Sequence, residues 1–168
     1  MNIKPEQLQN SLSNQLASTY FAFGAEILLV EQSLSMINGA ARENGFTERF
    51  RFDIDGNFSW ESMISLISSP SLFAEKRIIE CRLTTGKIGV KGSKALTEVV
   101  ENLPEDILLI ISSGKLEMAQ QKSKWFKALD KNGVIIQHWE VQSSQLVGWI
   151  TKNMSQLGLD SNIDVANA

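Results

Sequence analysis

Few residues in this chain have a type and spacing that could support catalysis, and the first candidate is a phosphate loop. Such a loop needs glycines whose N–H groups wrap the phosphates, followed by Lys and Ser or Thr. The turn Phe23–Leu28, after an apolar run rich in β-formers, has one glycine, Gly24, and no lysine. Glu26 adds negative charge where a phosphate would lie. We therefore expect no nucleotide and no other cofactor at this turn.

The remaining candidates for chemistry are Glu80, Cys81 and His138. A glutamate within a strand and beside an arginine is typically a paired surface charge, not a catalytic base. A lone thiol in an apolar run is typically a small core residue, and a single histidine cannot build a zinc site. We expect no catalytic residues and no metal site.

Charge and composition narrow the class of protein further. The chain has 168 residues, a net charge of −3, 43% hydrophobic residues and one cysteine. These values fit an ordinary globular domain and disfavour a protein whose main task is to neutralise phosphates. We find no targeting signal and no apolar run of the roughly 20 residues that a membrane span needs. We expect a soluble, cytoplasmic protein without a membrane partner.

The elements that must position these residues alternate between strand and helix. A helical stripe follows the glycine turn and closes before Gly45. The uniformly apolar run Ile107–Ile111 is typical of a central parallel strand covered on both faces. The remaining runs, read by their periodicity, complete about five strands, each followed by a helix. This pattern predicts an α/β fold, an open parallel sheet with right-handed crossovers.

In detail, we expect strands near 19–23, 49–54, 78–83, 107–111 and 134–137. The apolar positions of the expected helices are Leu8, Leu12 and Leu16; Ile27, Val30, Leu34, Ile37 and Ala41; Trp60, Met63, Ile64 and Ile67; Leu96, Val99, Val100 and Leu103; Leu116, Ala119, Phe126 and Leu129; and Leu146, Ile150 and Leu157. The tail Gly158–Ser161 reads as a break before a further helix near Ile163, which suggests a piece of a longer protein.

One connection carries an unusual pair of large apolar residues. Leu72 and Phe73 stand side by side after Pro70, in the polar stretch that precedes Lys76. Adjacent residues cannot share one face of a strand. Two interpretations are open at this point, because the pair could fold back into the core or serve as an exposed anchor for a partner.

Several stretches that span nearly the whole chain occur together in one order: Pro5–Leu8 through Tyr20 and Gly24, Ser71–Glu80, Arg82–Lys87, Leu103–Asp106 with Leu108–Ile110, Gly114–Leu116, and Gln121–Leu129. In this set the sequence resembles the delta subunit of bacterial DNA polymerase III. Ala25–Ile27 and Cys81 depart from the commoner family pattern.

The resemblance implies a fold and a role. It implies a RecA-like fold of the AAA+ type, with residues 1–140 as a clamp-binding domain without a functional phosphate loop. Residues 141–168 would begin a small helical lid. It also implies a clamp-loader subunit, a non-catalytic part of a DNA-directed DNA polymerase (a nucleotidyltransferase), which binds the sliding clamp and helps open it in DNA replication.

The resemblance also implies site residues and partners. The family's clamp-contacting pair corresponds to Leu72 and Phe73, preceded by Ser71. The expected partners are the sliding clamp (the beta subunit) and, in the full-length protein, the delta-prime and gamma/tau subunits and primer-template DNA.

The sequence itself leaves two alternative functions open. One is a nucleotide hydrolase with an unorthodox site. The other is a nucleic-acid-binding α/β module that uses a basic strip, which an acidic protein disfavours. The lysines of that strip would be Lys87, Lys91, Lys94, Lys115, Lys122 and Lys124.

Overall fold

The computed structural model describes residues 1–70 and 75–139, with the isolated positions Gly148, Thr151, Met154 and Ser155. The chain divides into two compact units, Met1–His138 and Trp139–Ala168. The expected helix bearing Leu146, Ile150 and Leu157 lies outside the described residues, as does nearly all of the expected lid. The fold described below is that of the first unit.

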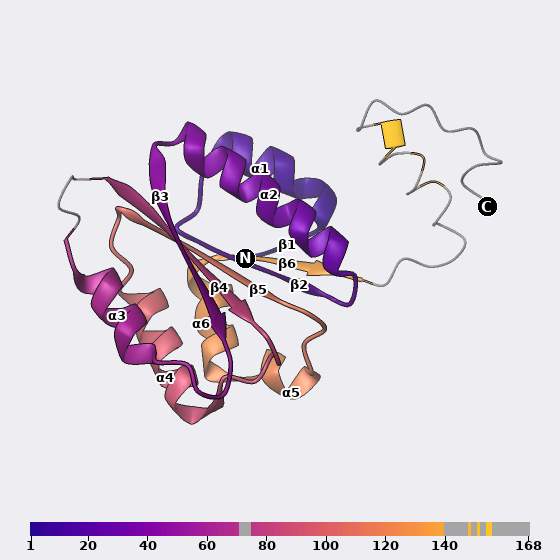
Figure 1. Cartoon of the computed structure of the whole chain (residues 1–168). Coiled ribbons are helices and arrows are strands. Elements are labelled where there is room, and N and C mark those ends of the chain that lie inside the picture. The colour runs from indigo at the N-terminus through magenta and orange to yellow at the C-terminus, as the bar shows by residue number, and fades with distance from the viewer. Residues whose placement is uncertain (71–74, 140–147, 149–150, 152–153, 156–168) are drawn as a thin grey trace. The chain divides into compact units, whose positions relative to one another are not determined.

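The first unit is built on one parallel sheet of six strands, in the order β1-β6-β2-β5-β4-β3 (Figure 1). All neighbouring strands in the sheet are parallel. The strands are β1 (Asn2–Ile3), β2 (Thr19–Gly24), β3 (Phe46–Ile54), β4 (Lys76–Leu83), β5 (Ile107–Ser113) and β6 (Val134–His138). The predicted open parallel α/β sheet is confirmed.

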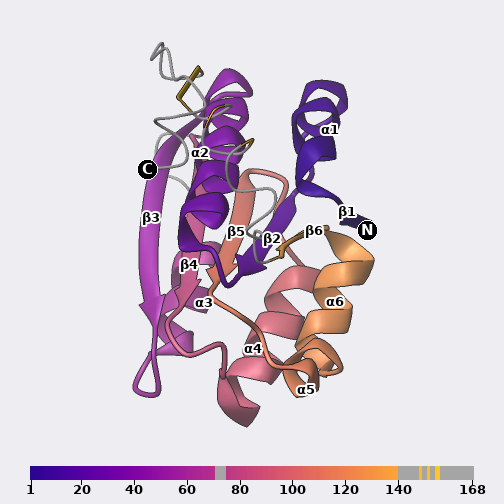
Figure 2. The ribbon, with the colours of Figure 1, turned by 90° about the vertical axis from the view of Figure 1, so that its right-hand side faces the viewer.

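Helices cover both faces of the sheet (Figures 1 and 2). One face carries η1 (Pro5–Gln7), α1 (Leu8–Asn14) and α2 (Ile27–Glu43). The other face carries α3 (Trp60–Ser68), α4 (Gly89–Glu101), α5 (Met118–Gln121) and α6 (Lys124–Asn132). None of the described helices is both long and apolar enough to cross a membrane.

Strand β5 divides two hydrophobic cores. Leu108 and Ile110 belong to the core under α1 and α2, and Ile107, Leu109 and Ile111 belong to the core under α3, α4 and α6. All five side chains are buried. Successive strand residues point to opposite faces, so a strand covered on both sides must be apolar at every position. The prediction from this run is therefore confirmed.

Helix α2 follows its predicted stripe except at its first residue. Val30, Leu34, Ile37 and Ala41 are buried, whereas Ile27 is exposed. Ile27 begins the helix, and the three-and-four spacing cannot reveal that no described element covers the first turn of this stripe. At the other end Gly45 adopts a φ of 85°, a conformation that favours glycine after a helix.

The structure differs from the predicted elements in several places, and Leu16 and Leu103, expected in helices, lie beyond the ends of α1 and α4. Strand β1 was not predicted, because two residues form a strand here only through pairing with β6. Strand β3 begins at Phe46, three residues before the alternating run that predicted it. The single helix expected between β5 and β6 is two helices, because the Ser123 side chain caps a new helix by accepting from the Phe126 N–H at 3.4 Å.

Candidate functional site

The turn between β2 and α2 occupies the position at which open parallel sheets commonly bind nucleotides. A Cβ added to Gly24 would lie 2.3 Å from the His138 carbonyl oxygen and 2.7 Å from its Cβ. Gly24 therefore permits the close approach of β6 to β2, in which the two residues are register partners. The helix N-cap, Glu26, makes no side-chain capping bond, and the exposed Ile27 follows it.

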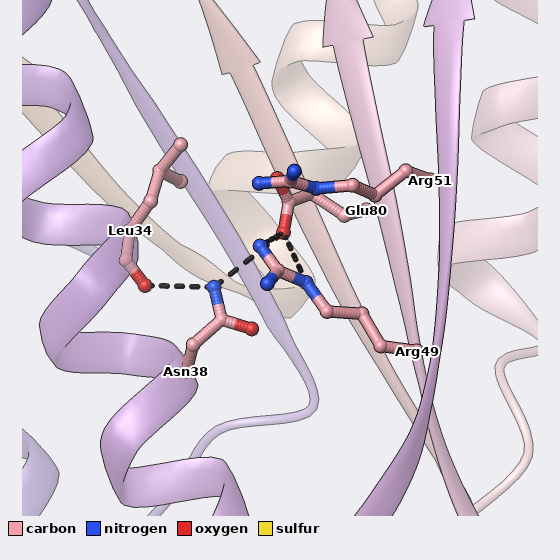
Figure 3. A network of polar contacts seen from close by, with 5 residues as sticks. All are labelled: Leu34, Asn38, Arg49, Arg51 and Glu80. Atoms are coloured by element: carbon pink, nitrogen blue, oxygen red, sulfur yellow. Dashed lines mark hydrogen bonds and ion pairs between the residues drawn. The ribbon is translucent and has the colours of Figure 1, made fainter.

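Glu80 lies at the centre of a polar network that joins β4, β3 and α2 (Figure 3). Its side chain is only 8% exposed. Arg49 donates from Nε at 3.0 Å and from Nη2 to one carboxylate oxygen, and Arg51 donates from Nε to the other at 3.2 Å. Asn38 Nδ2 lies 3.4 Å from Glu80 and also donates to the Leu34 carbonyl at 2.8 Å.

The expectation that Glu80 is a paired charge is thus right, but its placement on the surface is wrong. Its partners are also not the adjacent Arg82. They come from β3, because Arg51 is the register partner of Glu80 in the parallel pair. A buried carboxylate needs partners of this kind to offset the loss of water.

Cys81 and His138 are buried, in agreement with the structural roles expected for them. The Cys81 side chain is fully buried and its Sγ lies 3.5 Å from the Met63 sulfur. Burial, and then the neighbouring Glu80, raise the pKa of the thiol to about 12. His138 Nε2 lies 2.9 Å from the Ser33 hydroxyl, and burial lowers the pKa of the imidazole. In the described part of the chain, no three His, Cys, Asp or Glu side chains are grouped to hold a metal.

The predicted binding residues Ser71, Leu72 and Phe73 lie outside the described residues. The structure does describe the two ends of their connection. Helix α3 ends at Ser68, and Ser69 caps it with bonds from its N–H at 3.0 Å and its hydroxyl at 2.7 Å to the Ser65 carbonyl. Strand β4 begins at Lys76.

Arg77 ties the two ends of this connection together. Its side chain is 4% exposed, and its Nη1 donates to the Leu66 carbonyl of α3 at 2.9 Å. Its Nη2 lies 3.3 Å from the Asp106 carboxylate, while its backbone N–H donates to the Asp106 carbonyl at 2.8 Å. The last turn of α3, the start of β4 and the loop before β5 therefore share one charged side chain.

Residues Glu75 and Lys76 are held against the start of β3. Thr47 donates to the Glu75 carboxylate at 3.0 Å, and Lys76 Nζ donates to the Asn44 carbonyl at 3.2 Å. The same ammonium lies 5.3 Å from the centre of the Phe46 ring. Because the described strands are parallel, the start of β4 lies at the end of the sheet where the strands begin. The β2–α2 turn lies at the other end, where the strands finish.

Sequence reasoning missed the role of Arg77 and Asp106. Both occur in stretches that support the resemblance, but 29 residues separate them and no periodicity links them. The one signal in the sequence is an arginine that directly precedes an apolar strand. A charged residue at the start of a strand is common on protein surfaces, so this signal does not indicate a buried ion pair.

The family described as "DNA polymerase III, delta subunit" matches residues 20–138. The chain belongs to this family. The matched region contains the connection between α3 and β4, Arg77 with its partners, and the Glu80 network.

Members of the delta family resemble the chain along nearly its whole length. DNA polymerase III subunit delta of Escherichia coli (strain K12) is 30% identical over 167 residues, which is 99% of this chain and 48% of that protein. The same subunit of Haemophilus influenzae is 29% identical, over 95% of this chain and 47% of that protein. The chain thus spans about half the length of these relatives.

Two solved structures have a fold similar to that of this chain. The Bacillus subtilis DNA clamp loader delta protein has a TM-score of 0.67 at 16% identity, and the match covers 96% of this chain and 50% of that one. RuvB of Thermotoga maritima has a TM-score of 0.61 at 13% identity, over 96% of this chain and 54% of that one. The predicted RecA-like fold of the AAA+ type is confirmed.

Proposed function

We propose that this chain is the clamp-binding part of a clamp-loader delta subunit, which helps open the sliding clamp during DNA replication. Membership of the delta family carries the proposal, and a solved structure of similar fold is named as a clamp loader delta protein. The contact residues in this proposal are Ser71, Leu72 and Phe73. The beta subunit is the direct partner, and the delta-prime and gamma/tau subunits and primer-template DNA are partners of the full-length protein.

The described ends of the connection suit a binding segment that is held at both sides. Arg77 links α3 to β4, and Glu75 and Lys76 are bonded to the start of β3. A segment whose two ends are fixed loses less conformational entropy on binding, which improves affinity. A few buried apolar side chains commonly supply most of the energy of such an interface.

Opening of the clamp follows if Leu72 and Phe73 prefer one of its two states. A ligand shifts a conformational equilibrium only by its difference in affinity for the states. The pair must therefore bind a clamp with a loosened subunit interface more tightly than a closed one. This step requires no covalent chemistry in this chain.

The polar residues of the described unit support a non-catalytic role. Glu80 is saturated by two arginines, Cys81 has a pKa of about 12, and Gly24 makes room for β6. Each of these three residues has a structural role in the described unit. We further propose residues 1–140 as the clamp-binding domain and residues 141–168 as the start of the lid.

The test is calorimetric titration of the 168-residue chain against the sliding clamp of the same organism. The double variant Leu72→Ala, Phe73→Ala should lose about 2 kcal/mol or more of binding free energy. A matched control, Val90→Ala with Met118→Ala, shortens two exposed apolar side chains elsewhere and should bind like the unmodified chain.

Two outcomes count against the proposal. If the folded chain does not bind the clamp, the clamp-binding role is wrong for this part of the protein. If the Leu72→Ala, Phe73→Ala variant binds as tightly as the control, the role stands but the assigned contact is wrong.

A further inference from the structure

Strand β3 forms an edge of the sheet. It is nine residues long, and in the described residues β4 is its only strand neighbour. An edge strand presents alternate N–H and C=O groups that no neighbour uses. Phe50 and Phe52 pack against the core under α3 and α4, so one face of the strand is anchored, and no described strand pairs with its outer edge.

The other face of β3 carries charged side chains. Arg49, Arg51 and Asp53 alternate with the phenylalanines and therefore project toward the side of the sheet that α2 covers. In register, Arg51 stands beside Glu80 and Asp53 beside Arg82. Figure 3 shows both guanidinium groups of β3 reaching over Glu80 toward α2.

This face has a surplus of arginine. Arg49, Arg51 and Arg82 are opposed by Glu80 and Asp53, in a chain whose net charge is −3. The Arg51 side chain is 65% exposed and, in the described part of the molecule, contacts Glu80 through Nε alone. Its two terminal amino groups form a planar fork of the kind that binds carboxylates through paired hydrogen bonds.

We propose that the β3 edge binds an extended acidic segment of a partner protein as an added strand. Side chains at positions i and i+2 of an added strand share one face and would stand opposite Arg49 and Arg51. The expected motif is therefore two acidic residues separated by one other residue. The added backbone would bond to the open N–H and C=O groups of β3.

Charge and backbone chemistry select this occupant over others. A second copy of β3 would bring like charges opposite each other, which is destabilising. A nucleic acid cannot complete the hydrogen-bonding ladder of a strand, and the negative net charge of the chain opposes it. This surface uses none of the proposed clamp-contact residues Ser71, Leu72 and Phe73, so the inference does not depend on clamp binding.

The test uses fluorescence anisotropy with a labelled decapeptide in which Val and Glu alternate. A peptide of the same composition with all Glu residues in one block keeps the charge but loses the spacing. Arg51→Gln is the test variant, and Lys127→Gln on α6 makes the same charge change on the opposite face. Amide chemical shifts of residues 46–54 report on the strand edge.

We expect the alternating peptide to bind and to shift the β3 amides, and Arg51→Gln to weaken binding by about fivefold or more. Lys127→Gln should leave affinity within about twofold, as expected for a screened distant charge. Equal binding of the blocked peptide, equal loss in Lys127→Gln, unshifted β3 amides or no binding at all would overturn the proposal. Binding of an oligothymidine that competes with the peptide and depends on Arg51 would assign the surface to nucleic acid instead.

Discussion

The Arg77 guanidinium lies 3.3 Å from the Asp106 carboxylate, and the backbone N–H of Arg77 donates to the Asp106 carbonyl at 2.8 Å. Arg77 is almost fully buried, whereas the Asp106 side chain is 44% exposed. The buried Arg77 guanidinium therefore relies on the partly exposed Asp106 carboxylate to balance its charge. This relationship holds β4 beside the loop that leads into β5, directly after the proposed clamp-binding residues.

We predict that Asp106→Ala lowers the free energy of unfolding by about 2 kcal/mol, because it leaves a buried guanidinium without its carboxylate. Asp106→Asn keeps an acceptor and should cost less than Asp106→Ala. Urea unfolding followed by circular dichroism measures both values. A loss below about 0.5 kcal/mol in Asp106→Ala would mean that water replaces the carboxylate.

Removing the positive charges of the Glu80 network should cost more stability than removing its negative charge. Arg49→Ala with Arg51→Ala leaves a buried carboxylate unpaired and should cost about 3 kcal/mol. Glu80→Gln leaves two partly exposed arginines that water can solvate, and should cost about 1 kcal/mol. Denaturant unfolding of the two variants tests this order. A larger loss in Glu80→Gln would contradict the conclusion that the buried carboxylate needs the arginines more than they need it.

Gly24→Ala should destabilise the fold, because the new methyl group would meet the His138 carbonyl at 2.3 Å. We expect a loss of about 2 kcal/mol or more, the usual result of forced overpacking. Gly39→Ala is the matched control, since nothing lies within 4 Å of its added Cβ. That helical site should gain about 0.5–1 kcal/mol. Thermal unfolding distinguishes the two, and equal behaviour would contradict the packing role of Gly24.

His138 should make stability depend on pH. Burial lowers its folded-state pKa below the ordinary 6.5, so the unfolded chain binds the proton more readily. The contribution of His138 is complete above pH 6.5 and is lost as pH falls from there through the lowered folded pKa.

His138→Gln should remove most of this slope below pH 6.5, because Gln cannot titrate there. His138 is the single histidine of the chain, which makes the attribution direct. The measurement is the unfolding free energy at several pH values, with a Ser33→Ala variant as a control that keeps the imidazole. An unchanged slope in His138→Gln would contradict the prediction.

Local patterns in the sequence were sufficient for the parallel α/β class. The apolar run of β5 and, after Ile27, the stripe of α2 indicate which residues are buried, so they can be interpreted without knowledge of their neighbours. The same patterns missed β1, which exists only because it pairs with β6 at Ile135. They also missed the cap at Ser123 that separates α5 from α6.

The candidate site shows the same division. The residues themselves determined that no phosphate loop is present after Gly24 and that Leu72 and Phe73 form an unusual pair in a polar connection. Only the tertiary structure decided that Glu80 is paired by Arg49 and Arg51, that Gly24 makes room for His138, and that Arg77 joins Leu66 to Asp106. Periodicity records which side of an element is buried, whereas the partner of a buried charge depends on strand order and register, which arise when distant segments pack together.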